Sequence, residues 1–372
     1  MKKFFLYFII STTFLLNGCF NYKDIDKVLF VTSVIVDIDN NNSPVIYVEA
    51  FKPTRGGSGE SGKGERILYN GSGKTIFEIA RDLNLSSSYK INYSQNRGII
   101  FTQKAAEKCL SDFIDFFDRD QELVVRADFL VYKGDVQKLI NAKLKEQEFI
   151  GLFVHDLIYN IPASSRGIIL SLNDFLNKSY TKNSTAVVTM IGMKENQTED
   201  NLEVSDGAII KNFKMVDTLD RKQAEGYNFL IDNIRRGTLE VGNPSADGKF
   251  ITLEILKSKT NTKIYYDGKS VTVKKVIYTK TSIAEVQQRF TYNKEMTNKL
   301  EKNAESNIKL ACTRIFEEYK KKNLDIFNIS DDFDRKYPRE KIDDVLSKAQ
   351  LEVEVHVYVE GSSDTTDFGS KN

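Results

Sequence analysis

The composition is that of a folded protein. The chain has 372 residues, 41% of them hydrophobic and 28% charged, which excludes a disordered chain and is enough for two or three domains. Its 53 basic and 52 acidic residues leave a net charge of +1. This balance argues against a nucleic-acid-binding protein, which would carry a basic excess, and against a second, polybasic membrane anchor.

The first residues have the layout of an export signal. Lys2 and Lys3 precede an apolar run over 4–16 that is shorter than the roughly 20 apolar residues of a membrane-spanning helix. The run ends in Leu16-Asn17-Gly18-Cys19, which resembles the bacterial lipobox, where cleavage precedes a cysteine that carries a lipid. We therefore predict a signal peptide over 1–18 and lipidation of Cys19. The alternative is a secreted protein whose cysteine lies by chance near an ordinary cleavage site.

Lipidation would decide how the whole chain is held. Each buried CH₂ contributes about 0.8 kcal/mol, and a bacterial lipoprotein carries at least two acyl chains, which together give stable anchoring. The mature protein from Cys19 onward is then a soluble body tethered to the outer surface of a membrane.

Two further cysteines, Cys109 and Cys312, lie in apolar helical patterns. Unpaired cysteines in such patterns are usually small buried hydrophobic groups, so we predict two buried thiols. A disulfide between them stays open, because sequence spacing does not decide pairing.

The N-terminal region, 19–195, mixes strands and helices. A hairpin is predicted from two β-branched runs joined by Asp39-Asn40-Asn41-Asn42-Ser43-Pro44, and a Gly/Ser-rich loop occupies 53–64. Periodicity predicts strands at 28–36, 45–51, 65–69, 99–101, 124–132 and 186–192, and helices at 76–83, 105–117, 134–144, 149–160 and 172–176.

A polar segment at 195–202 is predicted as a domain boundary. The C-terminal region, 203–362, divides into a small hairpin-and-helix unit, 203–245, and a sheet with a long helix, 246–362. The second of these has strands at 250–258, 263–266, 270–282 and 351–359, helices at 291–322 and 340–348, and a turn at Asp267-Gly268. A polar tail follows at 363–372. The mixed order favours an α+β protein with antiparallel or mixed sheets and packed helices.

Several segments resemble nucleotide-binding or catalytic motifs, but each lacks a residue that the motif requires. Gly57-Ser58-Gly59-Glu60-Ser61-Gly62-Lys63 resembles a phosphate-binding loop, but Gly64 takes the place of the metal-binding Ser or Thr, and Gly73-Lys74-Thr75 has Leu68 where the first glycine belongs. We expect a plain loop and a helix start. No Gly-x-Ser-x-Gly elbow occurs, although counting residues does not exclude a Ser-His-Asp triad.

The remaining titratable candidates are few. His155, in an apolar helix pattern, is predicted to lie in the core or an interface, and His356 to face the polar side of its strand. Metal-ligand spacings are absent, so no zinc site and no cofactor are predicted. The pairs Asp331-Asp332 and Asp343-Asp344 are expected to face apart in solvent.

Nine segments, by their order and spacing, resemble the Ger(x)C family, the C-subunit lipoproteins of spore germinant receptors. They are 18–25, 31–37, 92–101, 126–130, 204–211, 226–227, 236–239, 325–329 and 335–338. Phe20 and Asn21 replace the family's Trp and Asp, and Ile326 and Asn328 replace Pro and Gly in an Asp-Pro-Phe-Gly element.

The resemblance implies a non-enzymatic subunit at the outer face of the spore inner membrane. Its partners would be the two polytopic membrane subunits, A and B, of the same receptor, which responds to small nutrient germinants, and it would have three α+β domains. Two other classes remain open. A solute-binding lipoprotein of a transporter would need two α/β lobes, and a surface hydrolase would need a cluster of polar groups in a pocket.

Overall fold

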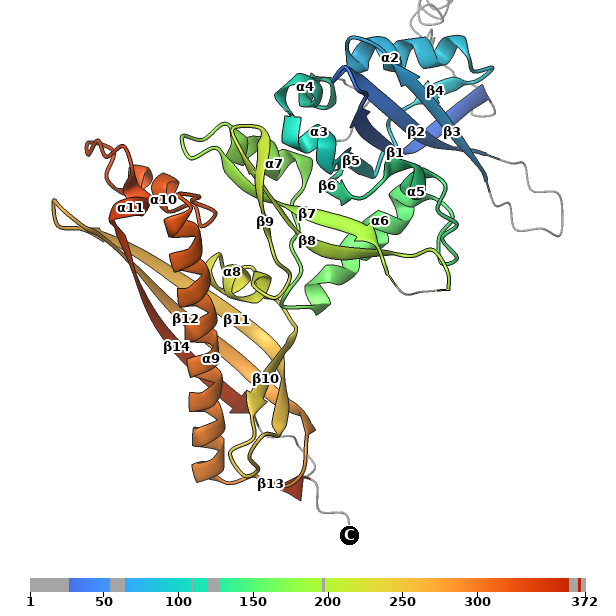
Figure 1. The fold of residues 1–372 in the computed structure, drawn as a ribbon. Helices are drawn as coiled ribbons and strands as arrows, with labels where there is room; N and C mark the ends of the chain where they lie inside the picture. The colour runs from blue at the N-terminus through green and yellow to red at the C-terminus, as the bar shows by residue number, and fades with distance from the viewer. Residues whose placement is uncertain are drawn as a thin grey trace, which may run out of the picture.

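The computed structural model describes residues 27–53, 64–108, 110–119, 127–195, 198–360 and 367–368. The predicted signal peptide, Cys19, Cys109, nearly all of the Gly/Ser-rich loop and most of the polar tail lie outside these residues. The chain forms two units, 27–219 and 224–360, each built on one large sheet with its helices. The two units follow one another in an elongated molecule (Figure 1). The predicted α+β class is confirmed.

The first unit is built on a mixed sheet, sheet A, with strand order β3-β2-β1-β5-β6-β7-β8-β9 and β4 beside β1. Its central strands β1, β5, β6 and β7 run parallel, and antiparallel strands flank them. A parallel centre is covered on both faces, so its strands are continuous apolar runs. The strands are β1 (Val28–Ile38), β2 (Pro44–Lys52), β3 (Glu65–Ser72), β4 (Lys90–Asn92), β5 (Gly98–Thr102), β6 (Asp128–Lys133), β7 (Thr185–Met193), β8 (Leu202–Lys211) and β9 (Lys214–Leu219).

Helices cover both faces of sheet A. One face packs against α2 (Ile76–Asp82), α3 (Gln103–Lys108), α4 (Ser111–Arg119) and α7 (Leu172–Ser179), and the other against α5 (Val136–Ile140) and α6 (Ile150–Asn160). Short 3₁₀ turns, η2 (Leu83–Leu85) and η3 (Ile161–Ala163), extend two of these helices. Thr75 caps α2 by accepting a hydrogen bond from the Glu78 N–H (3.2 Å), so Gly73-Lys74-Thr75 is the expected helix start.

A buried carboxylate fixes α6 on its face of the sheet. Glu49 of β2 is 0% exposed and accepts hydrogen bonds from the first backbone N–H groups of α6, at Ile150 (2.8 Å) and Gly151 (3.0 Å). It also accepts from Arg66 Nε (2.7 Å) and from the hydroxyls of Thr32 (2.7 Å) and Ser33 (3.1 Å). A Cβ on Gly151 would lie 2.1 Å from the Thr32 carbonyl oxygen, so the helix can approach this closely only with glycine there.

The polar segment at 195–202 lies in the chain between β7 and β8, and its last residue begins β8. β8 pairs antiparallel with β7, and β9 continues the sheet. The hairpin predicted within a separate 203–245 unit therefore extends sheet A, and the described residues form two large sheets where three α+β units were expected.

The second unit is built on sheet B, with order β10-β11-β12-β14. The strands are β10 (Thr238–Gly242), β11 (Phe250–Tyr266), β12 (Val271–Val286) and β14 (Ala349–Glu360), and β13 (Phe290–Thr291) pairs separately with β15 (Asp367–Phe368). The three strands predicted between 250 and 282 are two, because β11 runs unbroken through the polar residues 259–263. The Asp267-Gly268 turn is confirmed, with Gly268 at φ +92°.

One face of sheet B is covered by the long helix α9 (Lys294–Lys321), with α8 (Ala224–Leu230), α10 (Ile329–Lys336) and α11 (Val345–Lys348) beside it. Its buried stripe repeats every three or four residues, at Leu300, Ala304, Ile308, Cys312, Ile315, Phe316 and Tyr319. The helix predicted within 203–245 is α8, the one predicted at 340–348 is shorter in the structure, and α10 was not predicted.

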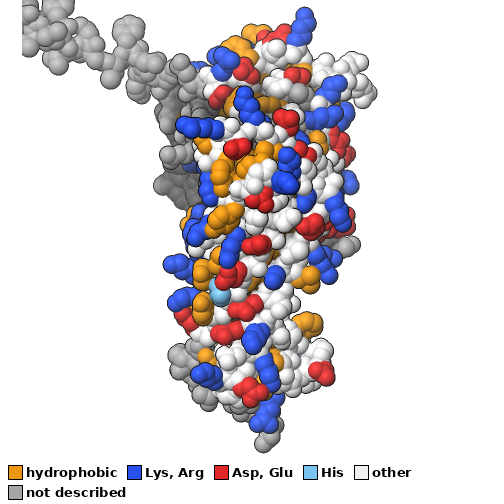
Figure 2. Space-filling model, turned by 90° about the vertical axis from the view of Figure 1, so that its left-hand side faces the viewer, with side chains coloured by type: hydrophobic (Ala, Val, Ile, Leu, Met, Phe, Trp, Pro, Cys, Tyr) orange, Lys and Arg blue, Asp and Glu red, His pale blue; other side chains and the backbone are white. Residues whose placement is uncertain are grey.

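The other face of sheet B carries no helix within the described residues. Tyr265, Tyr278 and Tyr358 are exposed on its strands, and Tyr278 stacks on His356 with ring centroids 5.0 Å apart. His356 therefore faces the polar side of β14, as predicted. Figure 2 shows one side of the molecule, where basic and acidic side chains are interspersed with small hydrophobic groups.

Candidate functional site

The two units are joined through a short segment after α6. Asn228 of α8, which is 1% exposed, donates from Nδ2 to the carbonyl oxygens of Ser165 (2.9 Å) and Gly167 (2.8 Å). Gly237 has φ +134°, and a Cβ there would lie 2.4 Å from the backbone nitrogen of Ser165. Only glycine fits this position, so Gly237 lets the start of β10 lie directly against the first unit.

A second group of contacts links the units through α9 and the loop before α10. Lys322 pairs with Asp217 of β9 (2.8 Å), and the Tyr319 hydroxyl donates to the Thr218 carbonyl oxygen (2.9 Å). Asn183, in the loop between α7 and β7, donates from Nδ2 to the Asp325 carbonyl oxygen (2.7 Å). These bonds tie the end of α9 and the start of α10 to the first unit.

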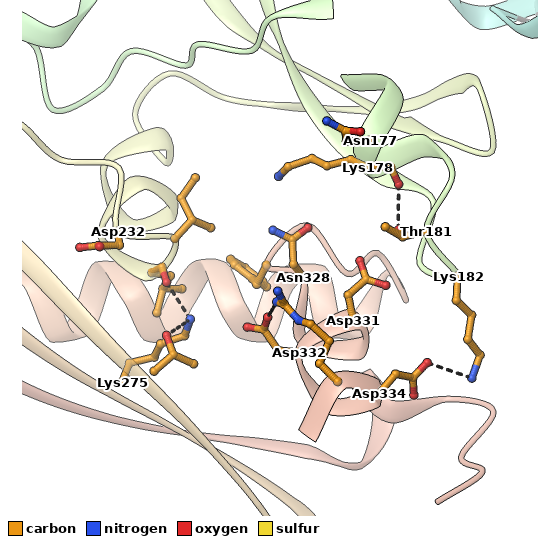
Figure 3. A pocket seen from close by; sticks show the side chains of 15 residues that line it. Asn177, Lys178, Thr181, Lys182, Asp232, Lys275, Asn328, Asp331, Asp332 and Asp334 are labelled. Atoms are coloured by element: carbon orange, nitrogen blue, oxygen red, sulfur yellow. Dashed lines mark hydrogen bonds and ion pairs between the residues drawn. The ribbon is translucent and has the colours of Figure 1, made fainter. Parts of the chain in front are cut away.

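A cavity of about 640 Å³, which we call the junction cavity, lies between the two units (Figure 3). The first unit contributes α7 and the loop after it. The second contributes the end of α8, strands β11 and β12, and α10. Its apolar wall consists of Leu230, Ile231 and Phe327, and the rest of the lining is polar or charged.

The α10 side of the junction cavity is held by Asp325. This side chain is 4% exposed and accepts from the backbone N–H groups of Phe327 (3.3 Å), Ile329 (3.0 Å) and Ser330 (2.7 Å). Burial raises the pKa of Asp325, and these hydrogen bonds oppose the rise. Asn328 at the N-cap has φ +59°, a left-handed conformation that asparagine tolerates. The Asp325 carboxylate and the left-handed Asn328 together position the first turn of α10 beside the cavity.

Most acidic groups of the cavity wall are already paired. Asp332 pairs with Arg335, Asp334 with Lys182 (3.5 Å) and Asp232 with Lys259. Figure 3 shows the first two pairs at the α10 side of the cavity. Asp331 accepts a long hydrogen bond from the Asn183 backbone N–H (3.4 Å).

Two lysines of the wall are less well compensated. Lys275 is 3% exposed and donates to two neutral oxygens, the Leu230 carbonyl (2.8 Å) and the Thr262 hydroxyl (2.8 Å). Lys178 is partly buried, and within the described residues its ammonium makes no hydrogen bond or ion pair. Burial lowers the pKa of both lysines, against the opposing influence of nearby aspartates.

Two family models of known proteins match almost all of the chain after the predicted signal peptide. A family model described as spore germination protein N-terminal domain matches residues 21–193, and one described as spore germination B3/GerAC like, C-terminal, matches 205–363. The chain belongs to the Ger(x)C family of spore germination proteins. The segment at 195–202, predicted as a domain boundary, lies where the two models meet.

Curated members of the family resemble the chain over most of its length. Spore germination protein GerQC of Bacillus cereus is 26% identical over 332 residues, which are 87% of this chain and 88% of that protein. Spore germination protein B3 of Bacillus subtilis is 24% identical over 82% of each chain. The crystal structure of the GerBC protein shares the fold, with a TM-score of 0.55, 16% identity, and coverage of 88% of this chain and 96% of that one.

The segments that carry the family resemblance have structural roles at the junction. Gly226 lies where α8 crosses α9, and a Cβ there would be 2.7 Å from the Ala311 carbonyl oxygen. Gly237 and Asp325, from two other such segments, hold β10 and α10 as described above. Gly226 therefore sets the packing of α8 on α9 within the second unit, whereas Gly237 and the Asp325 loop contact the first unit.

The candidate residues from sequence have mixed outcomes. Cys19 and Cys109 lie outside the described residues. Cys312 is a free, buried thiol, as predicted, and burial raises its pKa. His155 is not in the core, because its side chain is 42% exposed and its Nδ1 lies 2.8 Å from Asp128 Oδ2. Burial raises the pKa of Asp128 beside it.

The two adjacent acidic pairs also differ from expectation. Asp331 and Asp332 are both partly buried and line the same junction cavity, whereas the sequence predicts that they face apart in solvent. Asp343 is exposed as predicted, and Asp344 caps α11 by accepting from the Ser347 N–H (3.0 Å).

Sequence reasoning missed the two cavity lysines, although one left a signal. The inward positions of β12 read Val271, Val273, Lys275, Ile277, so the lysine interrupts an apolar face at period two. A lysine at such a position is buried and needs a partner. Lys178 left no such signal, because its surroundings come from the other unit.

The described residues show neither a metal-binding cluster nor a membrane-spanning helix. No group of three or more His, Cys, Asp or Glu side chains in them could hold a metal ion. None of the helices that the structure describes is both long and apolar enough to span a bilayer.

Proposed function

We propose that this chain is a lipid-anchored, non-enzymatic subunit of a spore nutrient germinant receptor. It acts in germination signalling by contacting the polytopic A and B subunits of the same receptor at the outer face of the spore inner membrane. The observation that carries the proposal is the family membership, which spans both units of the chain. Membership supports a role in germination, and the anchor and the partners are our inference.

The anchor is supported by the order of the chain. Cys19 ends a basic and apolar leader and precedes β1, which begins at Val28. A lipid at this cysteine would hold the first unit at the membrane surface, because two acyl chains are enough for stable attachment.

A contact role is supported by how the chain uses its polar groups. The buried carboxylates Glu49 and Asp325 accept hydrogen bonds at the starts of helices, and Gly237 sets the approach of the two units. These residues thus serve to hold the fold together, as expected for a subunit that acts by presenting surfaces to partners.

The test uses spores that carry the Cys19→Ala variant, with a gene deletion for comparison. We expect the deletion to abolish a nutrient response and leave growth unchanged, and the variant protein to leave the spore membrane fraction. A Cys312→Ala variant is the matched control, because its thiol is buried in the second unit. Full retention of Cys19→Ala in membranes, with a normal response, would contradict the anchor.

A solute-binding role would give a different result. Its deletion would impair uptake or growth on a particular solute and leave germination intact. That outcome would overturn the receptor proposal.

A further inference from the structure

The junction cavity is lined by four basic and four acidic side chains, but they are not all paired with one another. Three of its acidic groups have cationic partners of their own, as described above, whereas Asp331 and the ammonium of Lys178 form no ion pair within the described residues. Nearby aspartates act on Lys178 only at a distance, without a direct ion pair. Lys275 adds a second buried positive charge that meets only neutral oxygens among its hydrogen-bond partners in that part of the chain. A buried cation without a counter-ion is unfavourable, and a bound anion would relieve that cost.

The shape and lining of the cavity restrict which anion fits. A volume of about 640 Å³ is within the range of small-molecule sites. Leu230, Ile231 and Phe327 form an apolar wall that an inorganic ion would leave bare. A metal cation is disfavoured, because Asp232, Asp332 and Asp334 are already paired.

We propose that the junction cavity is a binding site for a small organic carboxylate. The carboxylate group pairs with the ammonium of Lys178, Lys275 contributes a second positive charge to the wall, and the carbon skeleton packs against the apolar residues of the second unit. Figure 3 shows Lys178 extending from α7 into the space that α10, β12 and the end of α8 enclose.

Such a ligand would bridge the two units. Lys178 belongs to the first unit, whereas Leu230 and Phe327 belong to the second, so occupancy adds a contact across the junction. This site goes beyond the proposed function, since it depends neither on the lipid nor on any partner subunit.

The test is equilibrium dialysis of radiolabelled benzoate against the full chain purified in detergent, with benzamide as the uncharged counterpart. We expect saturable binding with a Kd of about 1 mM or below, an affinity ordinary for a ligand of this size. Lys178→Met should weaken it by about tenfold or more, because the variant keeps the aliphatic stem and removes the charge. Lys302→Met is the matched control, since Lys302 is an exposed lysine of α9 outside the cavity lining, and it should bind benzoate as the parent chain does.

Folding of the variants is checked by circular dichroism, and Lys178→Gln serves as a second, more polar replacement. The proposal is overturned if benzoate shows no saturable binding up to about 10 mM. It is also overturned if benzamide binds equally well, or if both Lys178 variants fold and retain full affinity. Inorganic phosphate with an affinity equal to that of benzoate would show that the apolar wall has no role, and would overturn the organic class of the ligand.

Discussion

Replacing Glu49 by Ala should destabilise the first unit more than any surface change. The substitution removes the acceptor for Arg66 Nε (2.7 Å) and for the Ile150 (2.8 Å) and Gly151 (3.0 Å) N–H groups of α6, all in a site where the carboxylate is 0% exposed. Breaking a buried ion pair by removing one partner costs about 3–5 kcal/mol, and each orphaned donor adds to it. We therefore expect a loss of about 4 kcal/mol, a factor of about a thousand in the unfolding equilibrium of the first unit.

Hydrogen exchange measured by mass spectrometry separates this effect by region. In Glu49→Ala, the amides of α6 and of β1 and β2 should lose protection, while those of α9 and β12 in the second unit should change much less. Glu49→Gln, which keeps one acceptor oxygen, should lose about half as much stability. Glu254→Ala, at an exposed position of β11, is the control and should stay within about 0.5 kcal/mol of the parent chain. A loss below about 1 kcal/mol in Glu49→Ala would refute the reasoning, because the carboxylate would then not be what holds α6.

Three further predictions concern the junction. Gly237→Ala should cost about 2 kcal/mol and raise hydrogen exchange at Ser165 and β10, because of φ +134° and the 2.4 Å approach; unchanged exchange there would contradict the close contact. Asp325→Ala should cost about 2 kcal/mol and expose α10 to exchange, since three N–H groups lose their acceptor; protection of α10 equal to that of the parent chain would argue against the cap. Burial lowers the pKa of Lys178 from its ordinary 10.5. Between the folded-state pKa and 10.5, the unfolded chain therefore binds more protons than the folded chain, so the free energy of unfolding of the parent chain rises with pH over that range. Chemical denaturation should therefore show Lys178→Met at least as stable as the parent near neutral pH, with any advantage shrinking toward pH 10.5; an advantage that grows with pH would contradict the sign.

Sequence periodicity predicted most elements because their burial patterns are regular. β14 alternates buried and exposed residues along Val353, Glu354, Val355, His356 and Val357, and α9 repeats apolar residues on one stripe. The errors fall where tertiary structure decides. β11 continues through polar residues because its partner β12 pairs along its full length, and α10 starts at a cap from Asp325 that lies before it in the chain. Local propensity contains neither piece of information.

The candidate site was harder to predict than the fold. The sequence predicts that Asp331 and Asp332 face solvent, because neighbouring residues on a helix point in different directions, which is correct for a helix alone. The structure places them under α7 of the other unit, so their environment depends on a contact between segments far apart in the chain. The environment of Lys178 likewise depends on residues of the other unit. Only the inward register of Lys275 in β12 could have marked the cavity from sequence.

The most direct test of the account is purification of the intact protein from spore membranes through a C-terminal tag, followed by identification of the proteins that co-elute. The account predicts that both polytopic subunits of one germinant receptor elute with it in comparable amounts, and that they are lost when Cys19→Ala is the bait. Recovery of the tagged protein alone from membranes, or with the permease of a solute transporter in place of receptor subunits, would contradict it.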